Sequence, residues 1–291
     1  MKSERYQPVL LLIVLSLIWG TSFILIKQGL KVFSPDVVGA LRVSAACIIL
    51  LPLSLPRLRE LKPGDHVNIA MSGLIGIFIP AFLFATAQTK LDSSLAGILN
   101  TLSPLWTMIV GALFFQQRFR GHAVVGILIS FGGTVLLALS RSGGSITGFN
   151  AYALLIVAAC ALYGVNVNWV KFRVVGVSSV TLTSVSMLLV GPLAIVYLLA
   201  FTDFITTLTT QPGAWRAAGF IVLLALMSTA VAGLLFNKLI RVSTPIFASS
   251  VTYIMPLVAV SWGLLDGEQL TSGHYIAMLA IIGGVYLANR K

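Results

Sequence analysis

The stretch SPLWTMIVGALFFQQRFRGH, residues 103–122, recurs as MPLVAVSWGLLDGEQLTSGH, residues 255–274. Both copies carry Pro-Leu near the start, a glycine in the middle (Gly111 and Gly263) and Gly-His at the end. About half the chain length separates them, in a sequence with few charged residues. Such an internal repeat predicts a duplicated membrane bundle, which is the architecture of many carriers.

The composition predicts an all-α integral membrane protein. Of the 291 residues, 58% are hydrophobic and 9% are charged, whereas a soluble domain carries about 25% charged residues. Ten apolar runs are each long enough to cross a bilayer as a helix, and they are continuous rather than alternating, which argues against barrel strands. Only Arg42 interrupts them, and they cover residues 6–26, 37–56, 67–89, 93–117, 121–140, 142–170, 174–202, 217–237, 242–265 and 269–289.

The repeat extends upstream, because Trp19-Gly20 matches Tyr163-Gly164 and, at the same spacing, Lys27 matches Lys171. The alternative, chance similarity between leucine-rich helices, is disfavoured because proline, Gly-His and lysine all fall in register. We therefore expect residues 1–141 and residues 142–291 to hold five spans each. Since five is odd, the two repeats must enter the membrane from opposite sides, as inverted repeats.

The net charge of +11 is a topology signal. Most of the 19 basic residues fall in segments that are cytoplasmic if the N-terminus is inside, so the positive-inside rule places both termini in the cytoplasm. We expect residues 57–65 to face the cytoplasm, and residues 141–150 and 202–216 to face outward. This placement excludes nucleic acid as a partner. Cys47 and Cys160 lie inside predicted spans and are expected to be buried free thiols.

Short motifs along the chain add a family resemblance. They are Leu17-Ile18-Trp19-Gly20-Thr21-Ser22-Phe23 with Lys27, Ala40-Leu41-Arg42, Ser103-Pro104-Leu105, Met255-Pro256-Leu257, and Gly267-Glu268-Gln269-Leu270 followed by Gly273. In their order and spacing, over nearly the whole chain, the sequence resembles an EamA-type member of the drug/metabolite transporter superfamily. Gln116 departs from the pattern, because the family usually has glutamate there. The resemblance implies a ten-helix carrier, often an exporter, with a cavity among spans 1, 3, 4, 6, 8 and 9.

Pro104 and Pro256 lie near the middle of the fourth and ninth spans, and we expect helix kinks there. Proline lacks an N–H and displaces the carbonyl four residues earlier, which belongs to Asn100 in one repeat and to Thr252 in the other. A freed carbonyl at mid-membrane needs a partner or a watery cavity. The alternative is a plain packing kink in which a neighbouring Ser or Thr satisfies the freed carbonyl. A functional role is favoured because the proline occurs at equivalent positions of both repeats.

Aromatic, amide and hydroxyl side chains deep in the spans predict a substrate site, because this combination suits an amphiphilic small molecule. Hydrogen bonding between helices is the alternative for the polar ones, and core packing is the stronger alternative for the two phenylalanines of the third span. The candidate substrate-binding residues are Trp19, Ser22, Phe23, Phe78, Phe82, Asn100, Thr101, Ser103, Tyr163, Asn166, Thr252 and Tyr253.

No aspartate or glutamate is expected deep in a span, so the obvious proton carrier of a coupled transporter is missing and gradient-driven transport is the simpler hypothesis. Lys27, Lys171 and Arg42 are interpreted as residues near span ends whose charged groups snorkel to the headgroups. The chain has no GxxxxGK[ST] phosphate loop and no HExxH or GxSxG motif. We therefore expect no ATP-binding partner, no enzyme activity, no metal and no cofactor.

Taken together, the sequence predicts a bacterial inner-membrane carrier that exports small amphiphilic metabolites, amino acids first among them, by alternating access. A drug or nucleotide-sugar type carrier is the alternative within transport. A nucleotide sugar is doubly anionic, however, and would require several deep Lys or Arg residues. A non-transporting receptor or scaffold is the alternative outside transport, and it would not require an inverted repeat. The implied partners are a small-molecule substrate and the lipid bilayer, and the choice between monomer and homodimer stays open.

Overall fold

The structure is a computed structural model, and it describes residues 2–91, 93–141, 151–265 and 272–290. The Gly267-Glu268-Gln269-Leu270 motif and the expected outer linker at 142–150 lie outside these ranges. Within them, every regular element is helical. In chain order the elements are α1 (Lys2–Gly29), α2 (Pro35–Arg57), η1 (Leu58–Glu60), α3 (Asp65–Gly73), η2 (Leu74–Phe78), α4 (Ile79–Ala87), α5 (Ser93–Leu99), η3 (Asn100–Leu102), α6 (Ser103–Phe115), α7 (Gly121–Arg141), α8 (Ala153–Phe172), α9 (Ser179–Ala200), α10 (Phe204–Thr210), α11 (Ala214–Leu224), η4 (Ala225–Val231), α12 (Ala232–Val242), α13 (Pro245–Ser249), α14 (Val251–Leu265) and α15 (Ser272–Ala288).

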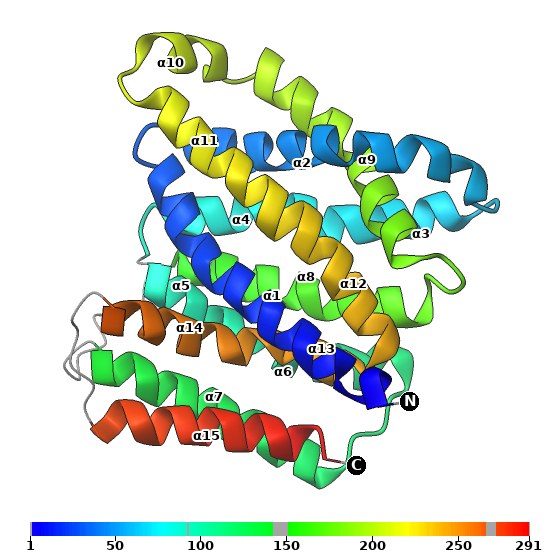
Figure 1. The fold of residues 1–291 in the computed structure, drawn as a ribbon, viewed down its shortest axis with the longest axis vertical. Coiled ribbons are helices and arrows are strands. Elements are labelled where there is room, and N and C mark those ends of the chain that lie inside the picture. Colours follow the sequence, from blue (N-terminus) through cyan, green and yellow to red (C-terminus); the bar gives the residue numbers. More distant parts are fainter. Residues whose placement is uncertain (1, 92, 142–150, 266–271, 291) are drawn as a thin grey trace.

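The helices confirm an all-α membrane protein with ten apolar segments. Seven helical stretches are long and apolar enough to cross a bilayer, and three shorter apolar helices cover residues 121–136, 245–258 and 272–288. Several spans are composite: α3, η2 and α4 form one, as do α11, η4 and α12. Figure 1 places both termini on one side of the bundle and α10 on the opposite side.

Two π-helical segments occupy corresponding places in the two repeats. The segment η2, Leu74–Phe78, interrupts the third span, and η4, Ala225–Val231, interrupts the eighth. A π-helix pairs residues five apart instead of four, is rare, and occurs mostly at functional sites. The sequence gives no indication of these segments, because the apolar pattern runs through both without a break.

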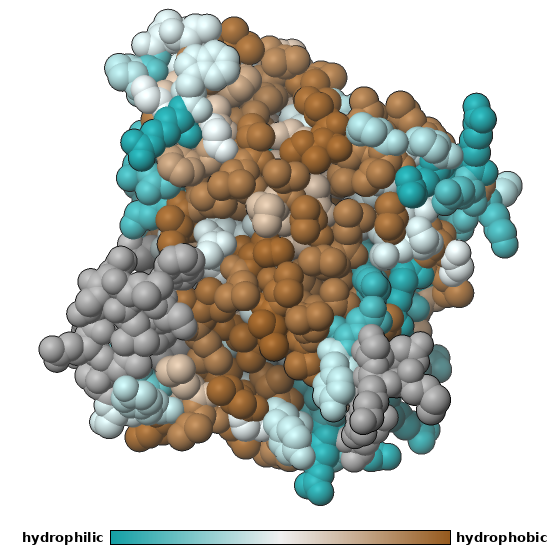
Figure 2. Space-filling model, in the orientation of Figure 1, coloured by the Kyte–Doolittle hydropathy of each residue, from teal (hydrophilic) through white to brown (hydrophobic). Residues whose placement is uncertain are grey.

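The outer surface matches a lipid environment. In Figure 2 a continuous apolar band crosses the visible face, and hydrophilic residues gather on either side of this band. Large side chains such as Phe114, Leu193 and Leu279 are exposed on the bundle surface. Such a surface would be costly in water, whereas in hydrocarbon it carries no penalty.

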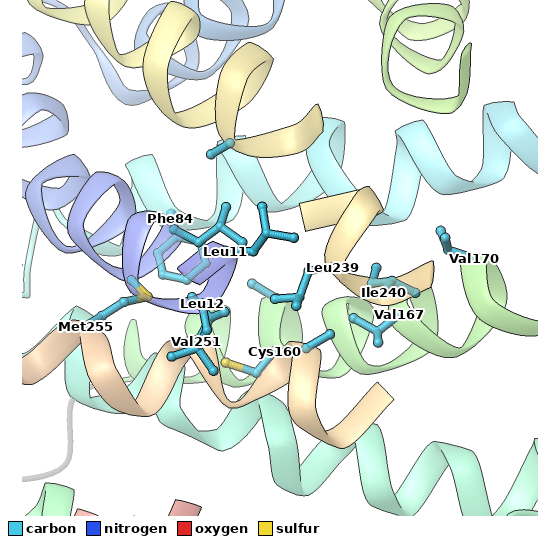
Figure 3. Close-up of a cluster of buried hydrophobic side chains, with 14 of the residues drawn as sticks. Leu11, Leu12, Phe84, Cys160, Val167, Val170, Leu239, Ile240, Val251 and Met255 are labelled. Carbon is cyan, nitrogen blue, oxygen red and sulfur yellow. The ribbon is translucent and has the colours of Figure 1, made fainter. Parts of the chain in front are cut away.

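Inside the bundle, apolar side chains from distant parts of the chain converge. Figure 3 shows buried residues of α1, α4, α8, α12 and α14 pointing toward one another, among them Leu12, Phe84, Val167 and Leu239. Both repeats contribute to this cluster. The helices of the two halves are therefore packed against each other through one shared core.

Lysines at equivalent positions of the repeats have different surroundings. The Lys171 Nζ donates to the carbonyl oxygens of Ile240 (3.0 Å), Arg241 (3.2 Å) and Ser243 (2.7 Å). It therefore satisfies carbonyls that the end of α12 leaves without a helical partner. Lys27, its counterpart in α1, is exposed. The snorkelling interpretation of Lys171 is therefore wrong.

The last spans of the two repeats, α7 and α15, lie side by side at one edge of the bundle (Figure 1) and approach closely at glycines. A Cβ added to Gly284 would lie 2.6 Å from the Gly126 carbonyl oxygen and 2.6 Å from the Ser130 backbone nitrogen. The Ser130 hydroxyl also donates to the Ile281 carbonyl oxygen at 3.2 Å. Small residues that let backbones approach are a general means of holding membrane helices together.

We expect Gly284→Ala to destabilise the protein, because the added methyl group would overlap the backbone of α7. Overpacking of this kind costs about 1–3 kcal/mol. Gly283→Ala is the matched control, because nothing lies within 4 Å of its added Cβ, and it should leave stability unchanged or slightly raised. Thermal unfolding of the detergent-solubilised variants measures both, and equal midpoints would refute the close approach of α7 and α15.

Candidate functional site

A central cavity of about 130 Å³ lies between the two repeats. For scale, an engineered apolar cavity of about 150 Å³ accommodates benzene. Six composite or single spans of the two repeats, together with α2 and α9, contribute to its wall. The lining residues are Trp19, Ser22, Phe23, Ile26, Arg42, Ser72, Gly76, Ile77, Phe84, Asn100, Ser103, Thr107, Tyr163, Asn166, Val167, Ser186, Ser228, Thr229, Gly233, Phe236, Asn237, Ser249, Thr252 and Met255.

On the cavity wall, two pairs of aromatic rings join the two repeats. The Trp19 and Phe236 rings meet edge to face with centroids 4.9 Å apart, and this pair joins the first repeat to the second. The Phe84 and Tyr163 rings stack with centroids 6.1 Å apart, again across the repeats. Edge-to-face and offset-stacked pairs are the favoured arrangements, so both pairs stabilise the contact between the halves. They also give the cavity flat apolar faces.

A second group of contacts joins α1 to the π segment η4. The Trp19 Nε1 donates to the Ser228 carbonyl oxygen at 2.9 Å, and the Ser22 and Ser228 hydroxyls are in hydrogen-bond contact. A π turn changes the hydrogen-bond partners of the backbone and leaves carbonyls that a side chain can use. The indole of Trp19 therefore satisfies a backbone group that the irregular segment exposes.

The other π segment is tied to α8 across the repeats. The Ser72 hydroxyl donates to the Asn166 Oδ1 at 2.8 Å. At Gly76, within η2, an added Cβ would lie 2.7 Å from the Asn166 Cγ. Glycine is therefore required at position 76 if the Asn166 amide is to keep its place on the cavity wall. Each repeat thus supplies a polar side chain that packs against the other.

The break in the fourth span lies where Pro104 predicts it. The helix changes to a 3-10 turn at Asn100–Leu102 and resumes at Ser103, with Pro104 in its first turn. The Asn100 carbonyl oxygen accepts a hydrogen bond from the Ser103 hydroxyl at 2.8 Å. A neighbouring serine thus satisfies it, as the packing alternative required, although both residues also line the cavity.

The ninth span is interrupted at a different place from the one expected. Pro256 lies inside α14, which the structure describes as one helix from Val251. The interruption comes earlier, at Ser250, between α13 and α14. Ser249 and Thr252 flank it, and both line the cavity.

The structure places eight of the twelve candidate residues on the cavity wall: Trp19, Ser22, Phe23, Asn100, Ser103, Tyr163, Asn166 and Thr252. The other four lie elsewhere. Phe78 and Phe82 pack against each other with ring centroids 5.1 Å apart, and Phe82 also meets Tyr197. The buried Thr101 hydroxyl donates to the Ile98 carbonyl oxygen. Tyr253, fully buried, donates its hydroxyl to the Ile127 carbonyl oxygen on α7.

Arg42 is the residue whose interpretation changes most. The sequence suggested a side chain that snorkels to the headgroups. In the structure it lines the cavity, and its Nε donates to the Thr229 Oγ1 in η4 at 2.9 Å. The snorkelling interpretation is therefore wrong for Arg42. Since it lies about two turns inside α2, the position alone could have indicated a role in the interior.

Many of the remaining lining residues that the sequence did not indicate are small hydroxyl and amide side chains, such as Ser72, Thr107, Ser186 and Asn237. Serine and threonine are common in membrane helices, so no single one stands out. Phe236 was missed because only its pairing with Trp19 distinguishes it from other apolar residues. In the described residues no three His, Cys, Asp or Glu side chains are grouped as they would be in a metal site.

Comparison of the sequence with known proteins agrees with a membrane carrier built from two repeats. The model of the EamA-like transporter family matches residues 7–139 and, separately, residues 150–290. An uncharacterized inner membrane transporter, YedA of Escherichia coli strain K12, is 29% identical over 285 residues, covering 95% of this chain and 88% of that protein. A probable amino-acid metabolite efflux pump of the same strain is 23% identical over 304 residues, covering 98% and 95%.

Two further comparisons agree with the family match. An uncharacterized transporter of Archaeoglobus fulgidus is 26% identical over 274 residues, covering 94% of this chain and 95% of that protein. One solved crystal structure has the same fold, with a TM-score of 0.73 and 20% sequence identity over 97% of this chain and 96% of that chain.

The division between lining and buried positions can be checked with cysteines. We expect Ser103→Cys to react with a small, water-soluble thiol reagent, because Ser103 lines the cavity, whereas Thr101→Cys should be protected. Both variants are made in a Cys47→Ser, Cys160→Ser background, and labelling rates are measured on purified protein. Faster labelling at position 101 than at position 103 would mean that another face of this span borders the cavity.

Proposed function

The chain belongs to the EamA-like transporter family, and we propose that it exports small amphiphilic metabolites, amino acids first among them, across the bacterial inner membrane. One observation carries the proposal. The cavity between the repeats combines aromatic faces with hydroxyl and amide groups, and it is enclosed by helices of both repeats. Such a lining suits a solute with one apolar and one polar end.

The relatives support the direction and the class of solute. One of them is named a probable amino-acid metabolite efflux pump, and another is named an inner membrane transporter. Carried over to this chain, these names support an inner-membrane carrier that moves amino-acid metabolites outward. The cavity volume supports a solute of about the size of a small amino acid. A nucleotide sugar, with two phosphates and several rings, is much larger and has only one cation on the cavity wall to pair with.

Alternating access is the mechanism that the repeat favours. In carriers with inverted repeats, one repeat rocks against the other around a fixed central site. Here hydrogen bonds such as Trp19–Ser228 and Ser72–Asn166 join the two repeats at the cavity wall. We propose that these contacts break and re-form as the cavity opens to one side and then to the other.

Transport should follow the solute gradient without a proton gradient, because the cavity lining contains no aspartate or glutamate. Proteoliposomes containing the purified protein should take up radiolabelled L-leucine, or another member of a panel of amino acids, faster than empty liposomes. An imposed pH difference should not drive accumulation. Accumulation driven by pH alone would refute gradient-driven transport, and no flux of any amino acid would refute the proposed class of solute.

Trp19→Ala and Tyr163→Ala should weaken transport while the protein remains folded and monodisperse, because each removes an aromatic wall of the cavity. A lost aromatic contact of about 1–2 kcal/mol corresponds to roughly 5–30-fold in apparent affinity. Phe220→Ala is the control, since this ring in α11 lies against Arg216 and not on the cavity. Concentration-dependent flux gives the affinity, and wild-type values in both cavity variants would contradict the site.

A further inference from the structure

Arg42 places a fixed positive charge at the cavity. It lies seven residues after Pro35, the first residue of α2, which corresponds to about 10 Å along the helix. Its side chain is partly buried and lines the cavity beside Thr229. Removing a charge from water is costly unless it is paired or hydrated, and a charge deep in a span marks a functional site by default.

No carboxylate of the described residues pairs with this charge. The chain has 8 acidic residues, and none of those that the structure describes is on the cavity lining. Asp36, six residues before Arg42 in α2, accepts a hydrogen bond from Tyr197 at 3.3 Å. The hydrogen bond that Arg42 makes is with the neutral Thr229 hydroxyl. Since a hydroxyl does not neutralise a guanidinium, the charge remains uncompensated within the described part of the chain.

The terminal nitrogens of Arg42 take part in no hydrogen bond among the described residues. The Nε donates a hydrogen bond to Thr229. The fully buried polar atoms without a hydrogen-bond partner include the Nη2 of Arg241 but neither Nη of Arg42. Both Nη atoms therefore remain available within the described structure. The two ends of a guanidinium match the two oxygens of a carboxylate in geometry and charge.

The second repeat carries no equivalent charge. The helices α2 and α9 each begin after an N-cap serine, Ser34 in one repeat and Ser178 in the other. Counted from these serines, the counterpart of Arg42 is Ser186, which lines the same cavity. The duplicated scaffold therefore presents one cationic subsite in an otherwise neutral cavity.

We propose that Arg42 binds a carboxylate of the transported solute, so that the carrier selects small monocarboxylates and amino acids over their amides and over amines. The inference rests on the proposed function in that the anion is part of the solute. A cationic solute would meet the positive Arg42 and no compensating acid. The ammonium group of an amino acid would instead meet aromatic faces and neutral oxygens, which can accept it without a carboxylate.

Equilibrium binding tests the proposal without requiring transport. Purified wild-type protein in detergent is titrated with matched acid and amide pairs, namely L-leucine and L-leucinamide, isocaproate and isocaproamide, and benzoate and benzamide. Isoamylamine is the matched amine. Affinity is measured by isothermal titration and by the shift in thermal unfolding. We expect the acids to bind at least about tenfold more tightly than their amides, because a charge-assisted pair is lost in the amide.

Two substitutions of Arg42 separate charge from folding. Arg42→Gln should abolish the preference for acids while leaving amide binding within about twofold of wild type, and Arg42→Lys should retain part of the preference. Lys27→Gln is the control, because it removes one positive charge from an exposed position of α1 and should behave as wild type. If Arg42→Gln fails to fold, the preference for acids is compared between Arg42→Lys and the wild type instead. An unchanged preference in Arg42→Lys would then overturn the proposal.

Three outcomes would overturn the proposal: no binding of any acid, equal binding of acids and amides by the wild type, or an unchanged preference in Arg42→Gln. Chloride titration covers an inorganic counter-ion as the occupant. Stabilisation of the wild type by chloride, with acids and amides binding alike, would assign Arg42 to that ion and refute the solute carboxylate. Acid-selective binding without flux in proteoliposomes would refute the proposed transport and leave the anion subsite standing.

Discussion

The structure depends on one constraint, which is that hydrocarbon offers no hydrogen bonds to a polypeptide backbone. Regular α-helix satisfies this constraint wherever the chain faces lipid. Inside the spans, the described chain departs from regular α-helix at four places, namely Leu74–Phe78, Asn100–Leu102, Ala225–Val231 and Ser250. Residues within or directly beside each of these places line the cavity. Irregular backbone is thus confined to the interior, where side chains and a polar space can satisfy the freed groups.

The fold could be predicted from sequence because hydrocarbon thickness and backbone satisfaction leave few alternatives. Apolar run lengths and one repeated motif were sufficient for the ten segments. The site could be predicted in part, because Trp19 and Tyr163 are unusual residues at equivalent positions. Tyr253 was misplaced because its hydroxyl finds the Ile127 carbonyl on a neighbouring helix, and such a partner cannot be deduced from the apolar pattern of one span. Arg42 was misread because a long side chain two turns inside α2 can in principle still extend to the headgroups, so the sequence does not distinguish snorkelling from burial.

Duplication and function make opposite demands on this chain. Two equivalent repeats give equivalent helix starts at Ser34 and Ser178 and equivalent π segments. A solute, however, is not symmetric, and the cavity must recognise one end of it. Under the proposed role of Arg42, this need is met by single side chains that differ between otherwise matched positions, such as Arg42 and Ser186. The scaffold can therefore keep its symmetry while the cavity does not.

The π segments also set the rotational phase of the helices that follow them. A π turn holds about one residue more than an α turn, which rotates every later side chain by about 100° around the axis. Beyond Gly76, an uninterrupted α-helix would return to the same face near Leu83, two turns later. After η2 the cavity instead receives Phe84, while Phe82 packs against Tyr197 on the far side. One additional residue of backbone thus decides that Phe84, and not Leu83, faces the interior.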